Sequence, residues 1–489
     1  MEAPRIGFNR WDLLHPAVGR GGLTASVVVP FFERPESIAQ VLAALRPQLE
    51  SLDQVIVVDD GSRPAQDRVA VPPGMLVKVL RRPPEGFALA AARNEGADTA
   101  TGDVLVFLDD DMIPDPSWLD SHMKWHAAYD GLLTVGTRRH VDPSQPDSEG
   151  EEPVHVANYL AWTNDLTAPA DDLFRICSGG NLGLRHRTFQ RLGGFDVTFD
   201  RYGVEDIEFG FRALQHGCVF VPEPGASCRH LGAPGYETPD KRSDNRRQRV
   251  WAMDLIAHPS FRPIATGRMF SRPWVNVLIP MDQRDDPSEI SGSVEAVLAS
   301  SLTDLRVVVL TAEGHPAREV DSAFRGDARV SVTVSGDGFS AGWDPDVPIH
   351  IELRRGYHPA PEHLNTITQA LLRHHVGVAH VRIDHAEVAS AWLTRAVARA
   401  RLCGADTPQD IAGMVEELFG ARWLPLPGGS AARQGGRWAQ DDLATIRSAL
   451  HRAPAPAVAA AAGLIRVAVA LRRRLRPLRA RLRRAVTPR

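Results

Sequence analysis

The sequence predicts an α/β fold built on a doubly wound, largely parallel sheet with helices on both faces. Three observations indicate it: short apolar strands alternate with helical patterns from residue 26 onward, several of these strands end in acidic turns, and a similar alternation starts again near residue 275. In sheets of this kind ligands bind beyond the carboxyl ends of the strands. The acidic turns are therefore the first place to look for a site.

The expected elements follow one another closely in the first hundred residues. Buried strands are predicted from short runs rich in valine and isoleucine, and helices from apolar residues at spacings of three and four. The predicted strands are 26–32, 54–62, 76–82 and 104–108, and the predicted helices are 34–49 and 88–100. The order strand, helix, strand implies parallel pairing.

Two acidic turns lie at the ends of predicted strands. Asp59 and Asp60 follow one strand, and the triplet Asp109, Asp110 and Asp111 follows another. Adjacent carboxylates raise one another's pKa unless a cation or a donor-rich ligand lies among them. Hard divalent cations are held by carboxylates and accept phosphate oxygens at their open positions. The alternative is a solvated helix start, where acids are also favourable.

A third acidic pair lies in residues 174–217. Glu205 and Asp206 stand at the predicted start of a helix, after the glycine pairs 179–180 and 193–194, which permit close backbone approach. A carboxylate there has the position of a general base, and helix capping is the alternative. Farther along the helix, the four-residue spacing of Glu208 and Arg212 predicts a surface salt bridge. His122 and His126, four residues apart, are expected on a helix surface.

The second half of the chain echoes the first. Residues 275–314 repeat the element order of residues 26–62, with Pro280 matching Pro30, and a later stretch echoes the strand before the triplet. In this comparison Thr311 and Ala312 replace Asp59 and Asp60, and the triplet shrinks to Asp384. We interpret the second half as a copy of the fold without the chemistry. The alternative is that any two strand-helix-strand units look alike.

Composition sets further limits. The 489 residues carry a formal charge of −4, which gives no reason to expect nucleic-acid binding. The four cysteines contain no CxxC pair, which indicates a reducing compartment. No apolar run of 18 residues appears, so a cytoplasmic protein is expected. Residues 464–489 combine a leucine stripe with many arginines. Such a segment fits a helix at an anionic membrane surface, an oligomerisation element, a disordered tail or a nucleic-acid patch.

Taken together, these segments resemble the family-2 glycosyltransferases with the GT-A fold, in particular chondroitin-polymerase-like and galactosyltransferase-like members. The resemblance covers roughly residues 24–235 and is carried by "VVVPFFERPE", "VIVVDDGS", "AARNEGADTATGDVLVFLDDDMIP", "SGGNLGLRHRTFQRLGGFD" and "GVEDIEFGFR". It implies an N-terminal extension (1–23), a catalytic GT-A domain (24–265), a degenerate GT-A-like repeat (273–425), and a linker with a basic tail (426–489).

The resemblance also implies roles for individual residues. Asp206 would be the catalytic base, and Glu205 a contact to acceptor or donor, with these two roles open to exchange. Asp111 with Asp109 and His230 would hold Mn²⁺ or Mg²⁺. The nucleotide-sugar contacts would be Pro30, Glu33, Asp59, Asp60, Arg93, Asp109, Asp110, Gly180 and Asn181.

The expected reaction is therefore an inverting, metal-dependent transfer from a nucleotide-diphosphate sugar, with a UDP-sugar favoured, to a carbohydrate, lipid-linked or small-molecule acceptor. Peripheral membrane contact through the tail and a homo-oligomer would be compatible with it. The competing readings are a retaining transferase, a nucleotidyltransferase and a catalytically idle carbohydrate-binding scaffold. A nucleotidyltransferase would need a basic glycine-rich loop after the first strand, which "PFFERPES" lacks.

Overall fold

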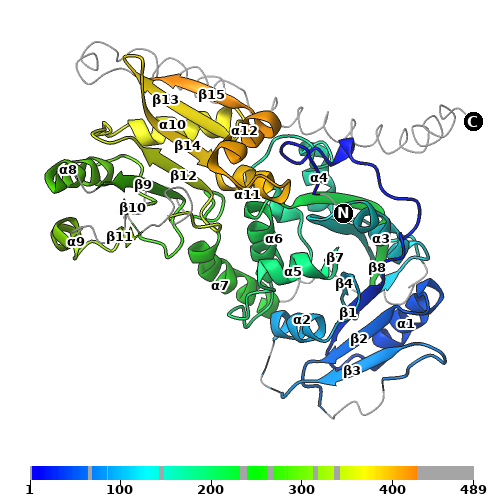
Figure 1. Ribbon diagram of the computed structural model, residues 1–489. Coiled ribbons are helices and arrows are strands. Elements are labelled where there is room, and N and C mark those ends of the chain that lie inside the picture. Colours follow the sequence, from blue (N-terminus) through cyan, green and yellow to red (C-terminus); the bar gives the residue numbers. More distant parts are fainter. Residues whose placement is uncertain are drawn as a thin grey trace, which may run out of the picture. The chain divides into compact units, whose positions relative to one another are not determined.

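The structure of the chain is a computed structural model (Figure 1). It describes residues 3–426, except residues 64–68, 85, 87, 143–147, 232–238, 263–267, 283–284, 312–317 and 335–341. Residues Met1–Pro425 form one compact unit that contains two sheets. The basic tail lies outside the described residues, so the expectations attached to it stay predictions.

The first sheet has eight strands in the described part of the chain, in the order β3-β2-β1-β4-β7-β6-β8-β5. Its strands are β1 (Ala25–Phe31), β2 (Gln54–Asp59), β3 (Val77–Arg81), β4 (Val104–Leu108), β5 (Met112–Pro114), β6 (Leu132–Val141), β7 (Asn181–Arg185) and β8 (Val219–Leu231). β1 to β4 are parallel, as predicted, whereas β7 runs antiparallel to both β4 and β6. The α/β class is confirmed, and the sheet is mixed rather than all parallel.

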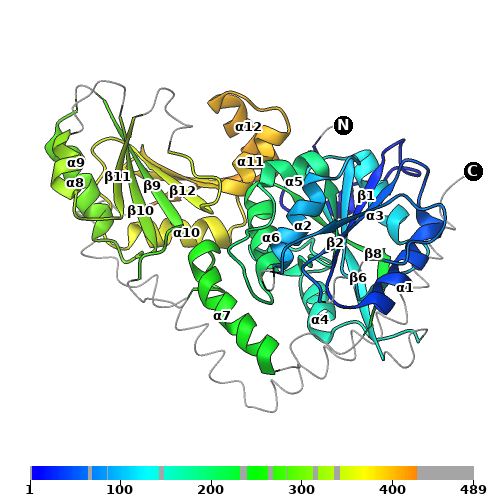
Figure 2. The same cartoon turned by 90° about the horizontal axis from the view of Figure 1, so that it is seen from below.

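Alternating side chains of the strands build a core on each face of this sheet. Val27 and Val29 of β1 pack in one cluster with helices α1 and α3, and Val28 packs in the other with α2, α5 and α6. The helices are α1 (Pro35–Leu45), α2 (Leu89–Asp98), α3 (Trp118–Ala128), α4 (Val154–Trp162), α5 (His186–Leu192), α6 (Glu205–Gln215) and α7 (Pro239–Leu255). Figure 2 shows the two groups of helices on opposite sides of the strands. Each fully buried valine or leucine contributes about 1.5–3 kcal/mol of transfer free energy.

Two expectations about surface residues are wrong. Glu208 and Arg212 form their ion pair at 2.7 Å, but Glu208 is fully buried and Arg212 nearly so. His122 and His126 are also fully buried, and both contact the Thr134 hydroxyl, at 2.7 and 3.0 Å. Burial lowers the pKa of His122 to about 4 and that of His126 to about 3, so both rings are neutral core groups at neutral pH. Polar residues at helical spacing indicate a solvent-exposed helix face only where no other element of the fold packs against that face.

The second sheet has the same arrangement as the first seven strands in the spatial order of the first sheet, β3 to β8. Its strands are β9 (Val275–Met281), β10 (Leu305–Thr311), β11 (Val330–Val334), β12 (Ile349–Leu353), β13 (Val378–Ile383), β14 (Ala386–Leu393) and β15 (Ala421–Pro425). Their order, β11-β10-β9-β12-β14-β13-β15, has the same parallel and antiparallel neighbours, place for place. The associated helices are α8 (Pro287–Leu298), α9 (Arg318–Phe324), α10 (His363–Arg373), α11 (Thr394–Leu402) and α12 (Pro408–Phe419). The domain boundaries implied by the resemblance stay predictions.

Strand register identifies the equivalent positions in the two sheets. Pro30 pairs with Val58 and Pro280 with Leu310, so Thr311 takes the place of Asp59, as the sequence echo predicted. Ala312 lies outside the described residues.

The echo is wrong about the triplet. In the second sheet the place of β4 is occupied by β12, not by β13. Glu352 of β12 pairs with β9 at the position where Phe107 of β4 pairs with β1. The triplet is therefore replaced by Arg354, Arg355 and Gly356 rather than by Asp384. The echo passed over β12, whose five residues gave too weak a pattern to be recognised.

The described residues contain no helix that is both long enough and apolar enough to cross a bilayer. All four cysteines are free thiols, and three of them are buried.

Candidate active site

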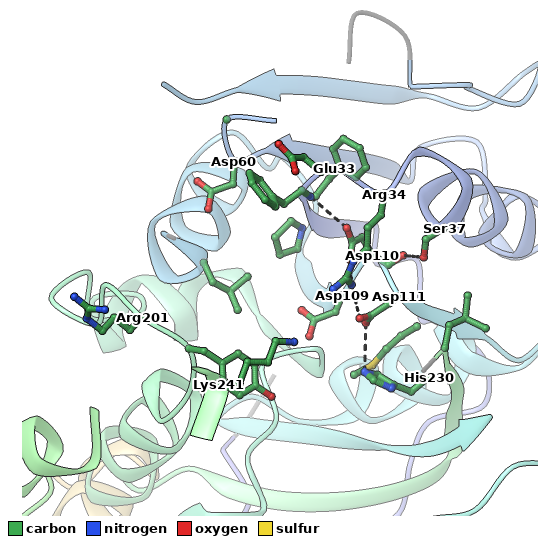
Figure 3. A pocket seen from close by; sticks show the side chains of 18 of the residues that line it. Glu33, Arg34, Ser37, Asp60, Asp109, Asp110, Asp111, Arg201, His230 and Lys241 are labelled. Carbon is green, nitrogen blue, oxygen red and sulfur yellow. Dashed lines mark hydrogen bonds and ion pairs between the residues drawn. The ribbon is translucent and has the colours of Figure 1, made fainter. Parts of the chain in front are cut away.

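A cavity of about 1280 Å³ lies beyond the carboxyl ends of β1, β2 and β4 (Figure 3). Its walls also include the ends of β6 and β8 and the start of α7. Of the residues predicted from the sequence, it is lined by Pro30, Glu33, Asp60, Asp109, Asp110, Asp111 and His230. The cavity thus brings together residues spread over two hundred positions of the chain, because parallel strands present their ends at one edge.

Asp110 anchors the triplet to the loop between β1 and α1. Its carboxylate accepts hydrogen bonds from the Phe32 backbone amide at 3.2 Å and from Arg34 Nη1 at 3.1 Å, and its carbonyl accepts one from the Ser37 hydroxyl at 2.5 Å. Burial, together with the neighbouring Asp111, raises the pKa of Asp110 to about 7. Asp110 therefore holds two loops together, and its ligand-binding capacity is largely used within the protein.

Asp111 faces His230 across the antiparallel pair β5–β8. Met112 pairs with His230, which leaves Asp111 Oδ1 3.5 Å from His230 Nε2. Arg34 Nη1 contacts the other carboxylate oxygen of Asp111 at 2.5 Å. His140 of β6 packs edge-on against the His230 ring, with 4.7 Å between ring centroids. Both Asp111 and His230 are largely enclosed yet line the cavity.

The pair of Asp111 and His230 fits a divalent cation. A carboxylate and an imidazole are ligands that Mn²⁺ accepts. In the structure the guanidinium of Arg34 supplies the positive charge next to Asp111. His230 Nδ1 is buried and has no hydrogen-bond partner among the described residues. The described ranges contain no group of three or more His, Cys, Asp or Glu side chains placed to hold a metal. An ion here would therefore need oxygens from a bound ligand as well.

Asp60 and Asp59 differ in what they can contact. Asp60 lines the cavity, where it accepts a hydrogen bond from the Ala88 amide at 3.0 Å and pairs with Arg82 at 3.1 Å. Burial raises its pKa. Asp59 is buried outside the cavity lining and accepts a hydrogen bond from the Ser62 amide at 2.9 Å, which closes the turn after β2. Asp60 is the residue of the pair that a ligand can reach.

Glu33 is held in the loop after β1 with a positive φ of 53°. Its carboxylate accepts a hydrogen bond from the Arg63 amide at 3.0 Å, and its own amide donates to the Ser62 hydroxyl at 2.9 Å. Non-glycine residues rarely adopt this conformation, and such strain concentrates at ligand-binding loops. Glu33 thereby links the loops that follow β1 and β2.

Arg93 connects the triplet to the third acidic pair. It is buried, with 2% of its surface exposed, and does not line the cavity. Its guanidinium donates to Asp109 Oδ1 at 2.9 Å and to Glu205 Oε1 at 3.0 Å. Burial alone would lower the pKa of Arg93, but these two carboxylates raise it. Arg93 is placed to fix two acidic segments rather than to touch a nucleotide base.

Gly179 and Gly180 make this junction possible. A Cβ atom on Gly180 would lie 2.2 Å from Asp109 Oδ2, and one on Gly179 would lie 2.5 Å from Arg93 Nη1. A larger residue at either position would therefore displace the Asp109 carboxylate or the Arg93 guanidinium. The role of Gly180 is therefore close packing behind the triplet.

Glu205 and Asp206 begin α6 after a strained turn. Gly203 and Val204 both have positive φ, of 96° and 81°, and this conformation is costly for the β-branched Val204. Burial and the adjacent Asp206 raise the pKa of Glu205 to about 7. Asp206 is less enclosed; burial raises its pKa, while Arg93 and the Gly179 amide oppose the rise. Neither side chain lines the cavity, but Arg201 and Tyr202, just before them, do.

Asn181 lies on the core side of β7. Its side-chain oxygen accepts hydrogen bonds from Trp118 at 2.8 Å and His122 at 3.0 Å, and its amide nitrogen donates to the Ala226 carbonyl at 2.9 Å. The side chain is fully used in fixing α3 against the sheet. The geometry gives no support to its predicted contact with a sugar.

The cavity also holds basic residues that sequence reasoning missed. They are Arg34, Arg63, Arg138, Arg201 and Lys241. Figure 3 shows Arg201 and Lys241 across the cavity from Glu33 and Asp60. Arg34 stands two residues after a predicted strand end, which was a usable signal. Lys241 gave none, because it lies on a helix far along the chain from the acidic turns.

Parts of the chain are similar to known proteins. Residues 26–193 match the model of glycosyl transferase family 2, and residues 171–230 match that of the N-terminal domain of galactosyltransferase. The chain is 29% identical to chondroitin synthase of Escherichia coli over 316 residues, covering 58% of this chain and 46% of that protein. It is 30% identical to validoxylamine A glucosyltransferase of Streptomyces hygroscopicus subsp. jinggangensis over 223 residues, covering 39% and 51%.

A crystal structure of GalNAc-T7 with UDP, GalNAc and Mn²⁺ overlaps 43% of this chain and 44% of its own, with a TM-score of 0.34 and 19% identity. The chain thus spans about half the length, or less, of these relatives.

Proposed function

Because the chain belongs to glycosyltransferase family 2 through residues 26–193, we propose that it transfers a sugar from a nucleotide-diphosphate sugar to an acceptor hydroxyl. The observation that carries the proposal is the single cavity lined by Asp60, Asp111 and His230, with the Glu205–Asp206 helix start joined to its floor through Arg93. Asp60 marks the nucleotide end and Asp111 the diphosphate end. A UDP-sugar is the donor we expect.

Asp111 and His230 would hold the Mn²⁺ or Mg²⁺ ion, which supplies positive charge to the diphosphate leaving group when bound. Arg34 would release Asp111 at that point and keep its contact with Asp110. Lys241 and Arg138 line the same cavity and add fixed positive charge near the leaving group. Asp109 is turned toward Arg93 and therefore supports the site from behind.

Asp206 is the proposed general base, and Glu205 the residue that positions it. Glu205 is bonded to Arg93, so it cannot accept a proton from a substrate without breaking a buried ion pair. Among the described residues, Asp206 accepts hydrogen bonds from the amides of Gly179 and Ile207 alone, and it keeps the capacity to accept a hydroxyl proton. Direct attack of the activated hydroxyl on the face of the sugar opposite the diphosphate inverts the anomeric centre.

The test starts with a panel of UDP- and GDP-sugars, in which hydrolysis of one donor in the presence of Mn²⁺ identifies the sugar. Asp206→Asn should then reduce transfer by about 10²–10⁴-fold while leaving metal-dependent nucleotide binding intact, since a general base contributes on that scale. Asp321→Asn, on the exposed face of α9, is the matched control and should behave as wild type. Near-normal turnover by Asp206→Asn would remove it as the base, a retained anomeric configuration would indicate a retaining transferase, and no metal-dependent nucleotide binding would indicate an idle scaffold.

A further inference from the structure

Helix α6, which carries Glu205 and Asp206, is held at both ends by different parts of the chain. At its start, Arg93 of α2 donates to Glu205. Its end lies against α11 and beside the loop of residues 342–348, which leads into β12 of the second sheet (Figure 2). All residues of these two segments are described, and none of them lines the cavity. The contacts with them are therefore a second set of constraints on the same helix.

An arginine of α11 lies at the carboxyl end of α6. Arg399 donates from Nε to the Gly217 carbonyl at 2.5 Å and from Nη1 to the Ile6 carbonyl at 3.0 Å. It is 2% exposed, and burial lowers its pKa to about 10, so it keeps its charge at neutral pH. Positive charge is favourable near the carboxyl end of a helix. A Cβ atom on Gly217 would lie 2.7 Å from the Arg399 backbone nitrogen, so α11 fixes this end of α6 closely.

A chain of ion pairs joins the last turns of α6 to the loop before β12. Asp346 of that loop lies 3.5 Å from His216 Nε2 and 3.2 Å from Arg272 Nη2. Arg272 also contacts Glu208 at 3.4 Å, and this buried carboxylate binds Arg212 through both of its oxygens at 2.7 Å. Burial alone would raise the pKa of Asp346, but the nearby His216 and Arg272 lower it. Asp346 is therefore a charged anchor between the second sheet and the end of α6.

The start of α6 depends on such anchors because it is strained and crowded. Val204, the residue before the helix, has a φ of 81°, which is unfavourable for a β-branched side chain. Glu205 and Asp206 place two carboxylates side by side in an enclosed setting, where they repel each other when both are charged. Strained conformations persist only where the surrounding structure holds them in place. A helix is a rigid element, so a constraint at its end also bears on its first residues.

We propose that the second sheet serves the transfer reaction by positioning α6. Asp346 and Arg272 hold the end of the helix, with Arg399 beside them, and this support keeps Asp206 in place at the start. None of the three supporting residues lines the cavity, so they are positioning residues rather than catalytic ones. The inference rests on the proposed function for the role of Asp206. It gives a task to a sheet whose carboxyl edge lacks the acidic triplet.

The experiment compares the full chain with Asp346→Asn and with Asp327→Asn as the matched control. Each change removes a carboxylate paired with an arginine, and the two aspartates are similarly exposed, at 20% and 27%. Asp327 precedes β11, which lies three places from β12 in the sheet. The measurements are kcat and donor KM for transfer, the affinity for UDP with Mn²⁺, and hydrogen exchange of residues 200–210 and 104–114 by mass spectrometry.

Asp346→Asn should lower kcat by about 10–100-fold, because a misplacement of about 1 Å can cost on the order of 10² in rate. Donor KM and UDP–Mn²⁺ affinity should stay near the wild-type values, since Asp60, Asp111 and His230 are not on α6. Exchange should become faster in residues 200–210 and remain unchanged in 104–114, and the control should match wild type throughout. Adding Val204→Gly to Asp346→Asn should restore part of kcat, because glycine adopts a positive φ without strain.

Equal kcat and equal exchange in Asp346→Asn and Asp327→Asn would overturn the proposal. A lower melting temperature with wild-type kcat in the folded protein would also overturn it, since a merely structural contact gives that result. If Asp346→Asn does not fold, Arg272→Gln removes the same ion pair from its other side and is measured in the same way. If the wild-type chain transfers no sugar, the proposed function falls, and exchange in residues 200–210 still decides whether the second sheet holds the start of α6.

Discussion

The carboxyl edges of the two sheets carry the same ion pair with its charges exchanged. In the first sheet, Arg34 of the loop after β1 binds Asp110 and Asp111, which follow β4. In the second sheet the arginine follows the fourth strand instead: Arg355, after β12, pairs with Asp282 and Asp285 of the loop after β9, at 3.3 and 3.5 Å. The strand order around both pairs is identical.

The exchange decides which edge can receive a cation. In the first sheet the carboxylates belong to the turn that faces the cavity and His230, and the arginine belongs to the loop after β1. In the second sheet the turn itself supplies the positive charge, so a divalent ion would meet a guanidinium. Under the proposed function, identical topology therefore gives one edge where carboxylates in the turn hold a metal and another where the turn carries the positive charge itself. Fold alone does not carry the chemistry.

The largest expected difference between the two edges is in metal-dependent nucleotide binding. Asp111→Asn should weaken the binding of UDP in the presence of Mn²⁺ by at least about 10–100-fold, the loss seen when even outer partners of metal ligands are removed. Asp282→Asn, the matched change in the second sheet, should leave that binding unchanged. Calorimetric titration of UDP with and without Mn²⁺ measures both. Equal losses in the two variants would refute the assignment of the metal to the first sheet.

A smaller difference is expected in the pH dependence of stability. Burial raises the pKa of Glu205 from 4.5 to about 7 in the folded chain. Between these values the folded chain holds a proton that the unfolded chain has lost, so the free energy of unfolding falls as the pH rises from 4.5 to 7. Glu205→Gln should make this fall shallower, as measured by urea denaturation across the window.

Glu387→Gln is the matched change in the second sheet, where His380 and Arg354 oppose the effect of burial and leave the pKa of Glu387 lowered. Glu387 contributes stability above its unfolded pKa, and that contribution is lost as the pH falls. Its removal should not flatten the decline between pH 4.5 and 7. An unchanged profile for Glu205→Gln would contradict the raised pKa of Glu205.

The sequence was sufficient for the elements up to residue 108 and for the acidic strand ends, because both depend on local patterns. Apolar runs ending in acids located β1, β2 and β4, and parallel strands bring such ends together. It was insufficient for the side-chain contacts that depend on how the helices pack on the sheet. Asn181 and His122 look like polar surface or ligand residues in the chain, yet they bond to each other inside the core. No local pattern distinguishes a satisfied buried polar group from a ligand.

The sequence also did not predict the ion pairs that join distant loops. Arg93 binds Glu205 across 112 positions, and Arg34 binds Asp111 across 77. These pairs decide which carboxylates are free, and neither spacing follows from periodicity. All three acidic segments therefore had equal standing in the sequence, whereas in the structure Arg93 holds Glu205 and Arg34 holds both Asp110 and Asp111.

The smallest expected effect concerns the arginines of the two edges. Arg34→Gln and Arg355→Gln each remove a half-exposed arginine from an ion pair and should each lower stability by about 1 kcal/mol. Their response to Mn²⁺ should differ, because Arg34 competes with a cation for Asp111 and Arg355 does not. Mn²⁺ should raise the melting temperature of Arg34→Gln more than that of wild type, and that of Arg355→Gln by the wild-type amount. An equal Mn²⁺ response in all three proteins would mean that the guanidinium of Arg34 does not occupy the place of the metal's charge.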